Sequence, residues 1–243
     1  MNLKISNAIV VEENGGRGYD NREELAEIDR ATPRRSFLAA TAGLGAAGLG
    51  AAVWAGMGSD SQAQEPQAGF PGSRREFDAA FTSIMKHENA HVCFLKNALG
   101  KAARPKPIFQ GLKQNNLREF IVLARAFENT GAGAYLNAAP AISNPAYLSA
   151  AASIALVEGR HAGFLNVASG QPITRMNEDF ESPITPSDVA KAVKPFIKSL
   201  NGGPPLTYSA TRSAANDIVI LNFALALEYL EADYYNINAP TFY

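Results

Sequence analysis

Six carboxylate and imidazole side chains stand where helix stripes would otherwise carry apolar residues. Two helix-like segments contain the pattern Glu-x-x-His, and two others contain a single glutamate in the same kind of stripe. Side chains three residues apart lie about 5–6 Å from each other on one helix face, so both members of a pair can reach one ion. The candidate metal ligands are Glu88, His91, Glu128, Glu158, His161 and Glu228.

Burying four unpaired carboxylates in one core would be prohibitively unfavourable unless positive charge lay among them. Two Glu-x-x-His pairs with two single glutamates form the ligand set of di-iron and di-manganese carboxylate bundles, in which shared carboxylates bridge two ions. Oxygen-rich ligation with one nitrogen per ion favours two iron or manganese ions as cofactors, and zinc is also compatible. Such a centre supports redox chemistry: metal oxidation, peroxide detoxification or oxygen activation. The chain would then be a di-metal oxidoreductase.

Three further residues border the predicted site. Glu231 follows Glu228 by three residues, and either could be the ligand, although the surrounding stripe is centred on Glu228. Tyr135 and Tyr235 each follow their single glutamate by two helical turns. Their hydroxyls could hydrogen-bond a ligand carboxylate of a neighbouring helix. Alternatively, both are ordinary core tyrosines.

The elements that must position these residues are four long segments of helical periodicity. They cover about 75–99, 116–138, 145–168 and 214–236, and apolar residues recur in each at three- and four-residue spacing. Four helices of this length predict an all-α fold built as a four-helix bundle. The helix ends carry typical signals, with proline at the start of the third segment and glycine after the first and third.

The connections have lengths that suit a bundle. The stretch 101–115 can span up to about 50 Å when extended, enough to cross the length of the bundle. The short link 139–144 suits a helical hairpin. A long second crossover at 170–212 is expected to hold one short helix at 187–200, bent at Pro195. No segment shows the alternation of a strand.

Residues 1–63 have the layout of an export signal with a disordered, polar beginning. Arg34 and Arg35 precede a weakly apolar run over 39–57, and small residues near Ala63 suit a signal peptidase. The paired arginines resemble a twin-arginine signal. We therefore expect a periplasmic or otherwise exported protein, which would fold and load its metal before crossing the membrane.

An uncleaved membrane anchor is the alternative for that segment, and it would be the chain's only membrane contact. Residues 64–75 are expected to be a linker, and 76–243 the helical domain. With 22 Lys and Arg against 23 Asp and Glu, the chain gives no reason to expect nucleic-acid binding. A single cysteine excludes a disulfide framework. Metal ions are the expected partners, and the oligomeric state stays open.

The motifs resemble the ferritin-like superfamily, and most closely its desiccation-related branch, which often carries twin-arginine signals. The resemblance spans about 77–236 and includes both Glu-x-x-His pairs and the stretch around Glu228. That last stretch is similar to the family's first helix, in which the corresponding glutamate is a metal ligand. Here it comes last, which suggests a circular permutation of the bundle. Alternatively, it docks differently or pairs with a second copy.

Two other functions compete with the redox hypothesis. The resemblance also implies a non-catalytic stress or desiccation-related bundle. In addition, residues 87–91 match His-Glu-x-x-His, in which two histidines bind zinc and the glutamate is the general base of a protease. That motif is short, and it leaves the other glutamates unexplained. Replacing His87 would distinguish the two, because on the dinuclear hypothesis His87 is at most an outer partner of the site.

Overall fold

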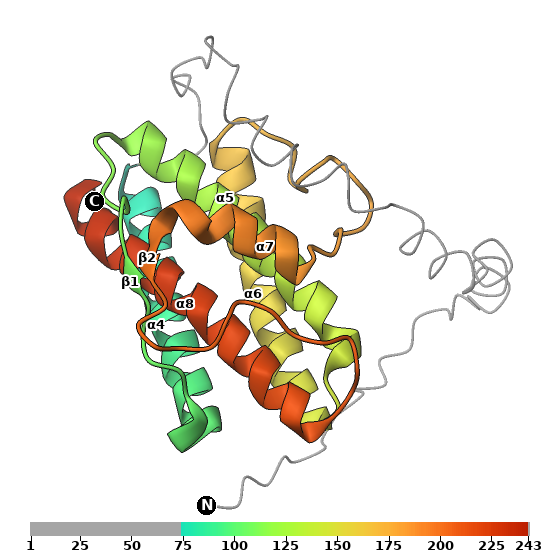
Figure 1. The fold of residues 1–243 in the computed structure, drawn as a ribbon. Helices are drawn as coiled ribbons and strands as arrows, with labels where there is room; N and C mark the ends of the chain where they lie inside the picture. Colours follow the sequence, from blue (N-terminus) through green and yellow to red (C-terminus); the bar gives the residue numbers. More distant parts are fainter. Residues whose placement is uncertain (1–73, 243) are drawn as a thin grey trace, which may run out of the picture. The chain divides into compact units, whose positions relative to one another are not determined.

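The computed structural model describes residues 74–242, and four long helices dominate this part of the chain (Figure 1). This confirms the predicted all-α fold. The match to the predicted segments is within a few residues at most ends. The long helices are α4 (Arg74–Leu99), α5 (Leu117–Ala138), α6 (Pro145–Ala168) and α8 (Ala214–Phe242).

Local signals explain where these helices begin and end. The Asn116 side chain accepts a hydrogen bond from the Glu119 backbone N–H at 2.9 Å, and Asn144 caps α6 in the same way. Gly100 and Gly170 follow α4 and α6 with φ of 54° and 70°. Glycine adopts this left-handed conformation without the steric penalty of a Cβ atom, so it stops a helix cleanly.

Two local predictions need correction. The helix expected at 187–200 is only α7 (Pro186–Val193), followed by a 3-10 turn over Lys194–Phe196. Pro195 has no N–H to continue the α-helical hydrogen bonding, so it ends the helix rather than bending it. Two short strands also occur, β1 (Ile108–Phe109) and β2 (Ile197–Ser199), which pair antiparallel. Their length is too short to leave an alternating pattern in the sequence.

Helix α8 runs six residues beyond its predicted end at Asn236. Asn238 explains the extension, because its Nδ2 donates to the Leu112 carbonyl at 2.9 Å and its Oδ1 accepts from the Gln114 backbone N–H at 2.8 Å. These contacts tie the last turns of α8 to the link that precedes α5. The last residues of α8 have low helix propensity, so a tertiary contact determines where this helix ends.

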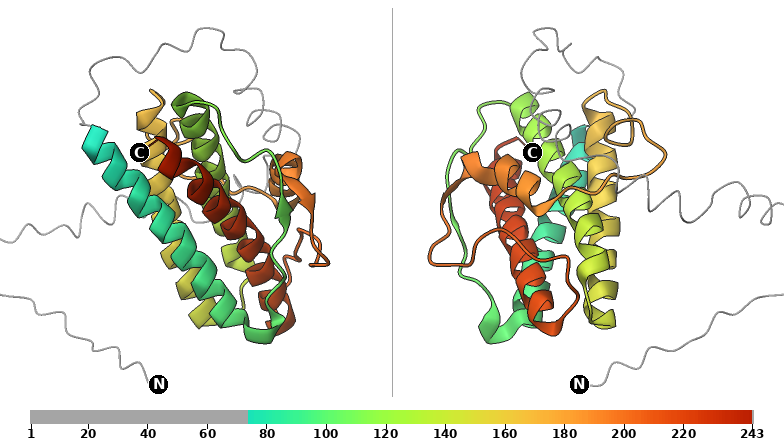
Figure 2. Two further views of the ribbon diagram at one scale, coloured as in Figure 1. Left: turned by 90° about the vertical axis from the view of Figure 1, so that its left-hand side faces the viewer. Right: turned by 45° about the vertical axis from the view of Figure 1, so that its right-hand side comes forward.

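The four helices form two antiparallel pairs, α4 with α8 and α5 with α6 (Figure 2). The α8 helix also packs against α5, which joins the pairs into one bundle. The links around β1 and β2 run along the outside, where the two strands hold them together. Arg104 fastens the first link by donating its backbone N–H to the Asn222 side chain on α8 at 2.6 Å.

The apolar core is divided into two clusters, which a polar layer separates. Along α4, Phe81 and Ile84 belong to one cluster and Leu95 and Leu99 to the other. The candidate ligands of α4 lie between them in sequence. The same division recurs on α6, where the buried residues before Glu158 belong to one cluster and Leu165 to the other, so the polar side chains form a layer at mid-bundle.

Helix α4 begins at Arg74, inside the stretch expected to be a linker. The predicted export signal lies outside the described residues. Among residues 74–242, no helix combines the length and apolarity needed to span a bilayer.

Candidate metal centre

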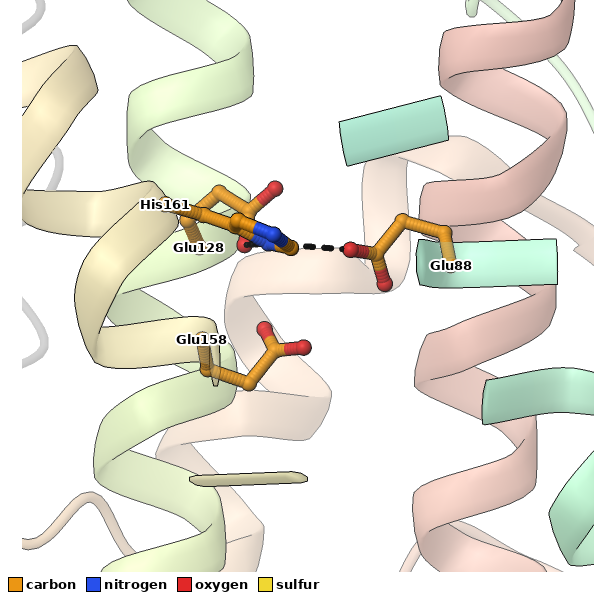
Figure 3. Close-up of side chains that lie close together, drawn as sticks. All are labelled: Glu88, Glu128, Glu158 and His161. Carbon is orange, nitrogen blue, oxygen red and sulfur yellow. Dashed lines mark hydrogen bonds and ion pairs between the residues drawn. The ribbon is translucent and has the colours of Figure 1, made fainter. Parts of the chain in front are cut away.

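The polar layer contains four fully buried glutamates, one from each long helix. Glu88, Glu128, Glu158 and Glu228 all have a relative exposure of 0%, and two histidines lie beside them with 9% or less. Figure 3 shows Glu88 pointing across the bundle toward Glu128, Glu158 and His161. Each glutamate sits where the heptad-like spacing of its helix faces the interior, so the fold brings together residues up to 140 positions apart.

One half of this layer is a set of four possible ligands for one ion. Glu88, Glu128, Glu158 and His161 each offer a ligand atom within 4.8 Å of the others. His161 Nδ1 lies 3.0 Å from a Glu88 oxygen and 3.1 Å from a Glu128 oxygen. Glu128 of α5 and His161 of α6 belong to this set only. The α5/α6 pair therefore supplies the ligands that are specific to this position.

The other half is a second set of the same composition. Glu88, His91, Glu158 and Glu228 also lie within 4.8 Å of one another. His91 Nδ1 lies 3.2 Å from a Glu228 oxygen and 3.3 Å from oxygens of Glu88 and Glu158. The α4/α8 pair supplies the ligands peculiar to this position. Glu88 and Glu158 belong to both sets, which is the arrangement of carboxylates that bridge two cations.

The hydrogen bonding of the two shared carboxylates tests whether ions fit here. Within the described residues, none of the four buried oxygens of Glu88 and Glu158 accepts a well-aligned hydrogen bond, and the groups closest to them are the two imidazoles. A buried carboxylate without well-aligned donors is strongly destabilising, and a cation removes that penalty. Two hard cations between the glutamates, each completed by one imidazole, satisfy these oxygens, so the residues present fit two metal ions.

The pKa values of the carboxyls reflect their crowding. Burial raises the pKa of Glu158 well above its ordinary range, and the negative charges of the surrounding glutamates raise it further. Burial and the charge of Glu88 raise the pKa of Glu228 to about 7, although His91 opposes this. Burial also raises the pKa of Glu88, but the two adjacent imidazoles outweigh it and lower that pKa to about 2.

The imidazoles respond in the opposite direction. Burial lowers the pKa of His91 and of His161, but hydrogen bonds and charges from the neighbouring glutamates raise both to about 10. Without ions, protonated histidines therefore partly neutralise the carboxylates. Ions would replace those protons, because a ligating imidazole must be neutral.

Two tyrosines link the helix pairs through Glu128 and Glu228, the terminal glutamates, which each belong to only one ligand set. Tyr135 on α5 donates its hydroxyl proton to Glu228 on α8. Tyr235 on α8 donates to Glu128 on α5 at 2.6 Å. Of the two roles open to these tyrosines, the structure supports the bond to a carboxylate of a neighbouring helix. Each bond fixes one carboxylate oxygen and leaves the other to face the centre.

Glu231 lies outside both ligand sets, and Glu228 lies inside one of them. Glu231 is nevertheless buried, and burial together with the charges of Glu128 and Glu228 raises its pKa well above the ordinary range. It lies against Gly131 of α5. A Cβ atom at Gly131 would come within 3.2 Å of Glu231 Oε1 and 2.7 Å of Glu158 Oε2. The glycine therefore provides the space that these two carboxylates occupy.

Gly131 is a site residue that the sequence interpretation missed. Its signal was the absence of a side chain one turn after Glu128, at the interior-facing edge of α5. From the sequence, His87 is expected to be either a zinc ligand or an outer partner of the site. The structure places His87 outside both ligand sets, with Nδ1 2.9 Å from Nε2 of His161. This placement does not favour the zinc protease hypothesis, which needs His87 and His91 on one ion.

A small apolar cavity lies beside the layer, between α5, α6 and α8. Its volume is about 20 Å³, and Tyr135 and Leu227 are among its lining residues. This is enough space for one water-sized molecule. Tyr135, which lines this cavity, also bonds Glu228, and the apolar lining does not suit a charged molecule.

A family model described as a ferritin-like domain matches residues 45–171, just over half of the chain. The chain belongs to the ferritin-like family. The match includes α4, α5 and α6 with five of the six candidate ligands, and it ends before α8. It begins inside the segment predicted to be an export signal. No match was found among curated proteins or among solved structures.

Membership of the ferritin-like family and the buried Glu/His cluster are together compatible with a dinuclear metal site. The family match also supports the four-helix architecture found around the cluster. The geometry also indicates which ligand side chains belong to both cation positions and which belong to only one.

Proposed function

We propose that this ferritin-like protein binds two iron or manganese ions at mid-bundle and uses them for redox chemistry on a small neutral molecule. The observation that carries the proposal is the pair of buried glutamates, Glu88 and Glu158, that are shared by two equivalent ligand sets and whose oxygens accept no well-aligned hydrogen bond. Bound ions of this kind would supply one-electron oxidation and reduction.

The residues of the chain would hold and shield that centre. Glu128 with His161, and Glu228 with His91, would each complete one ion. Tyr135 and Tyr235 would orient the terminal carboxylates, and their phenol groups could hold a proton close to the reacting molecule. The two apolar clusters on either side of the layer would exclude bulk water. The small apolar cavity would admit a small apolar molecule such as oxygen more readily than a charged substrate.

The experiment is metal analysis and turnover of the purified full chain after loading with iron or manganese. We expect two ions per chain, catalase activity or metal-dependent oxygen consumption, and loss of both ions in Glu88→Gln. Fewer than one transition-metal ion per chain would contradict the proposal. Full metallation without any turnover would favour the alternative of a non-catalytic stress or desiccation-related protein.

We also propose that the helix order is circularly permuted relative to the rest of the family. The end of α8 and the start of α4 lie at the same end of the bundle (Figure 2), and α8 packs antiparallel to α4. A chain in which residues 214–242 precede residue 74 through a short linker should therefore fold and bind the same number of ions. Failure of that chain to fold would count against permutation.

Export by the twin-arginine route is a further proposal, supported by Arg34 and Arg35 before the weakly apolar run. Replacing both arginines with lysine should retain the protein in the cytoplasm. Cell fractionation in a bacterial host measures this directly, and an unchanged distribution would contradict the proposed route.

A further inference from the structure

The outer nitrogen of His161 faces a second imidazole. His87 Nδ1 lies 2.9 Å from His161 Nε2. The two rings are within 6° of parallel, and their centroids are 5.2 Å apart. This separation matches two imidazoles joined edge to edge, because an N–H···N bond lies in the plane of both rings. The contact is therefore a directed hydrogen bond rather than a stack of ring faces.

The position of the shared proton follows from the side of His161 that would bind an ion. Its Nδ1 faces Glu88 and Glu128, so this nitrogen must carry the free electron pair in the metal-bound protein. The proton of the neutral ring then lies on Nε2 and is donated to His87 Nδ1. His87 thereby fixes both the tautomer and the ring orientation that metal binding at His161 requires.

The other ligand histidine, His91, has no such support from the part of the chain that the structure describes. Val157 precedes Glu158 on α6 just as His87 precedes Glu88 on α4, and a valine side chain accepts no hydrogen bond. Within residues 74–242, the hydrogen bond and ion pairs of His91 all involve Nδ1 and none involves Nε2. The terminal glutamates are supported equally, because Glu128 and Glu228 each accept one hydrogen bond from a tyrosine hydroxyl.

On the basis of the proposed function, we propose that the two cation positions are inequivalent. The position between Glu128 and His161 binds its ion first and more tightly than the other position does. His87 is the positioning residue, because it orients the His161 ring. A hydrogen-bond partner on a ligating histidine is typically worth about 10–100-fold in metal affinity. The two shared carboxylates belong to both positions, so the additional hydrogen bond from His161 to His87 favours loading of this position first.

Titration of the metal-free full chain with Mn²⁺ tests the order, with bound ions followed by electron paramagnetic resonance. We expect two steps with affinities at least about tenfold apart. A signal from isolated Mn²⁺ should precede the signal of a coupled pair. An anomalous-scattering map from crystals that contain one equivalent of Mn²⁺ should show its main peak beside His161.

Variants assign the difference to His87, which is exposed and can be replaced without opening the core. His87→Ala should weaken the tighter step by about tenfold or more and leave the weaker step unchanged. His87→Asn keeps an oxygen acceptor near the position of Nδ1 and should restore most of that affinity. Val157→Ala is the matched control at the equivalent place on α6, and it should change neither step.

Equal affinities for both ions in the unaltered protein would overturn the proposal. So would an unchanged tighter step in His87→Ala, or a first peak beside His91. Binding of fewer than one Mn²⁺ per chain by the unaltered protein is a different result, because it would contradict the proposed dinuclear centre itself.

Discussion

The α5/α6 pair and the α4/α8 pair build the same half-site from very different stretches of chain. A six-residue link joins α5 to α6, whereas α4 and α8 are separated by more than 110 residues of other structure. Each pair nevertheless contributes one Glu-x-x-His helix, one single glutamate and one tyrosine that crosses to the other pair. The ligand set therefore depends on equivalent positions in space, and chain proximity is not needed.

Two differences between the pairs lie directly beside the ligands. Gly131 follows Glu128 by three residues, whereas Glu231 follows Glu228 by the same interval. His87 precedes Glu88, whereas Val157 precedes Glu158. The metal ligands are thus matched, while the groups that support and crowd them are not. The predictions below test how far the match extends.

The largest effect is expected from removing a shared ligand. Glu158→Gln should abolish binding of both ions, because the carboxylate belongs to both ligand sets. The same change should stabilise the metal-free protein by about 1 kcal/mol or more, since it replaces a buried carboxyl that is crowded by other acids with a neutral amide. Metal analysis and thermal unfolding measure the two effects. Retention of two ions would show that the glutamate is not shared.

Removing a terminal ligand should affect one position only. Glu128→Gln and Glu228→Gln should each reduce the bound metal from two ions to about one, because each residue belongs to a single ligand set. Their similar results would confirm that the helix pairs are equivalent in their ligands. Loss of both ions in either variant would instead indicate that the positions fill only as a unit.

The metal-free protein should lose stability as pH rises. The Glu228 pKa of about 7 lies above its ordinary value. Its contribution to the free energy of unfolding is therefore full below about pH 4.5 and is lost as pH rises through 7. His91 and His161 have pKa values of about 10, so their stabilising contributions are lost between about pH 6.5 and 10. The change from Glu228 alone is on the order of 3 kcal/mol.

Thermal unfolding of the chelator-treated and Mn²⁺-loaded proteins between pH 5 and 8 measures this dependence. The difference in melting temperature between the two samples should grow with pH, because ions replace the protons that the site otherwise needs. A metal-free protein that becomes more stable over this range would contradict the buried carboxyl cluster.

Gly131→Ala should disturb the centre, and Gly159→Ala should not. Both are helical glycines, so both gain about 0.5–1 kcal/mol of helix stability from alanine. A Cβ atom at Gly131 would meet the Glu158 carboxylate at 2.7 Å, whereas one at Gly159 meets no atom within 4 Å. We expect Gly131→Ala to weaken metal binding by about tenfold, on the scale of outer-shell changes. Equal affinities in the two variants would refute this role.

The smallest effects are expected from the two tyrosines. Tyr135→Phe and Tyr235→Phe each remove one hydrogen bond to a terminal carboxylate. Each should weaken one position by about fivefold, which corresponds to the roughly 1 kcal/mol of a typical hydrogen bond, and leave the other position unchanged. Mn²⁺ titration measures both. A large difference between the two variants would reveal a further inequality between the helix pairs.

The sequence by itself determined the four long helices and the residues at the centre. Apolar spacing, the caps at Asn116 and Asn144, and the glycines after α4 and α6 are local signals, so the boundaries of these helices were predictable except for the end of α8. The interior position of Glu88, Glu128, Glu158 and Glu228 was also predictable, because each interrupts an apolar stripe. Their burial confirms that interpretation.

Tertiary structure alone decided which residues support the ligands. The contact between His87 and His161, the space at Gly131 and the exclusion of Glu231 depend on how α4, α5, α6 and α8 face each other. The pairing of β1 with β2 and the last turns of α8 likewise depend on contacts between distant links. Helix periodicity specifies the face that a side chain occupies, but it contains no information about which neighbour that face will meet.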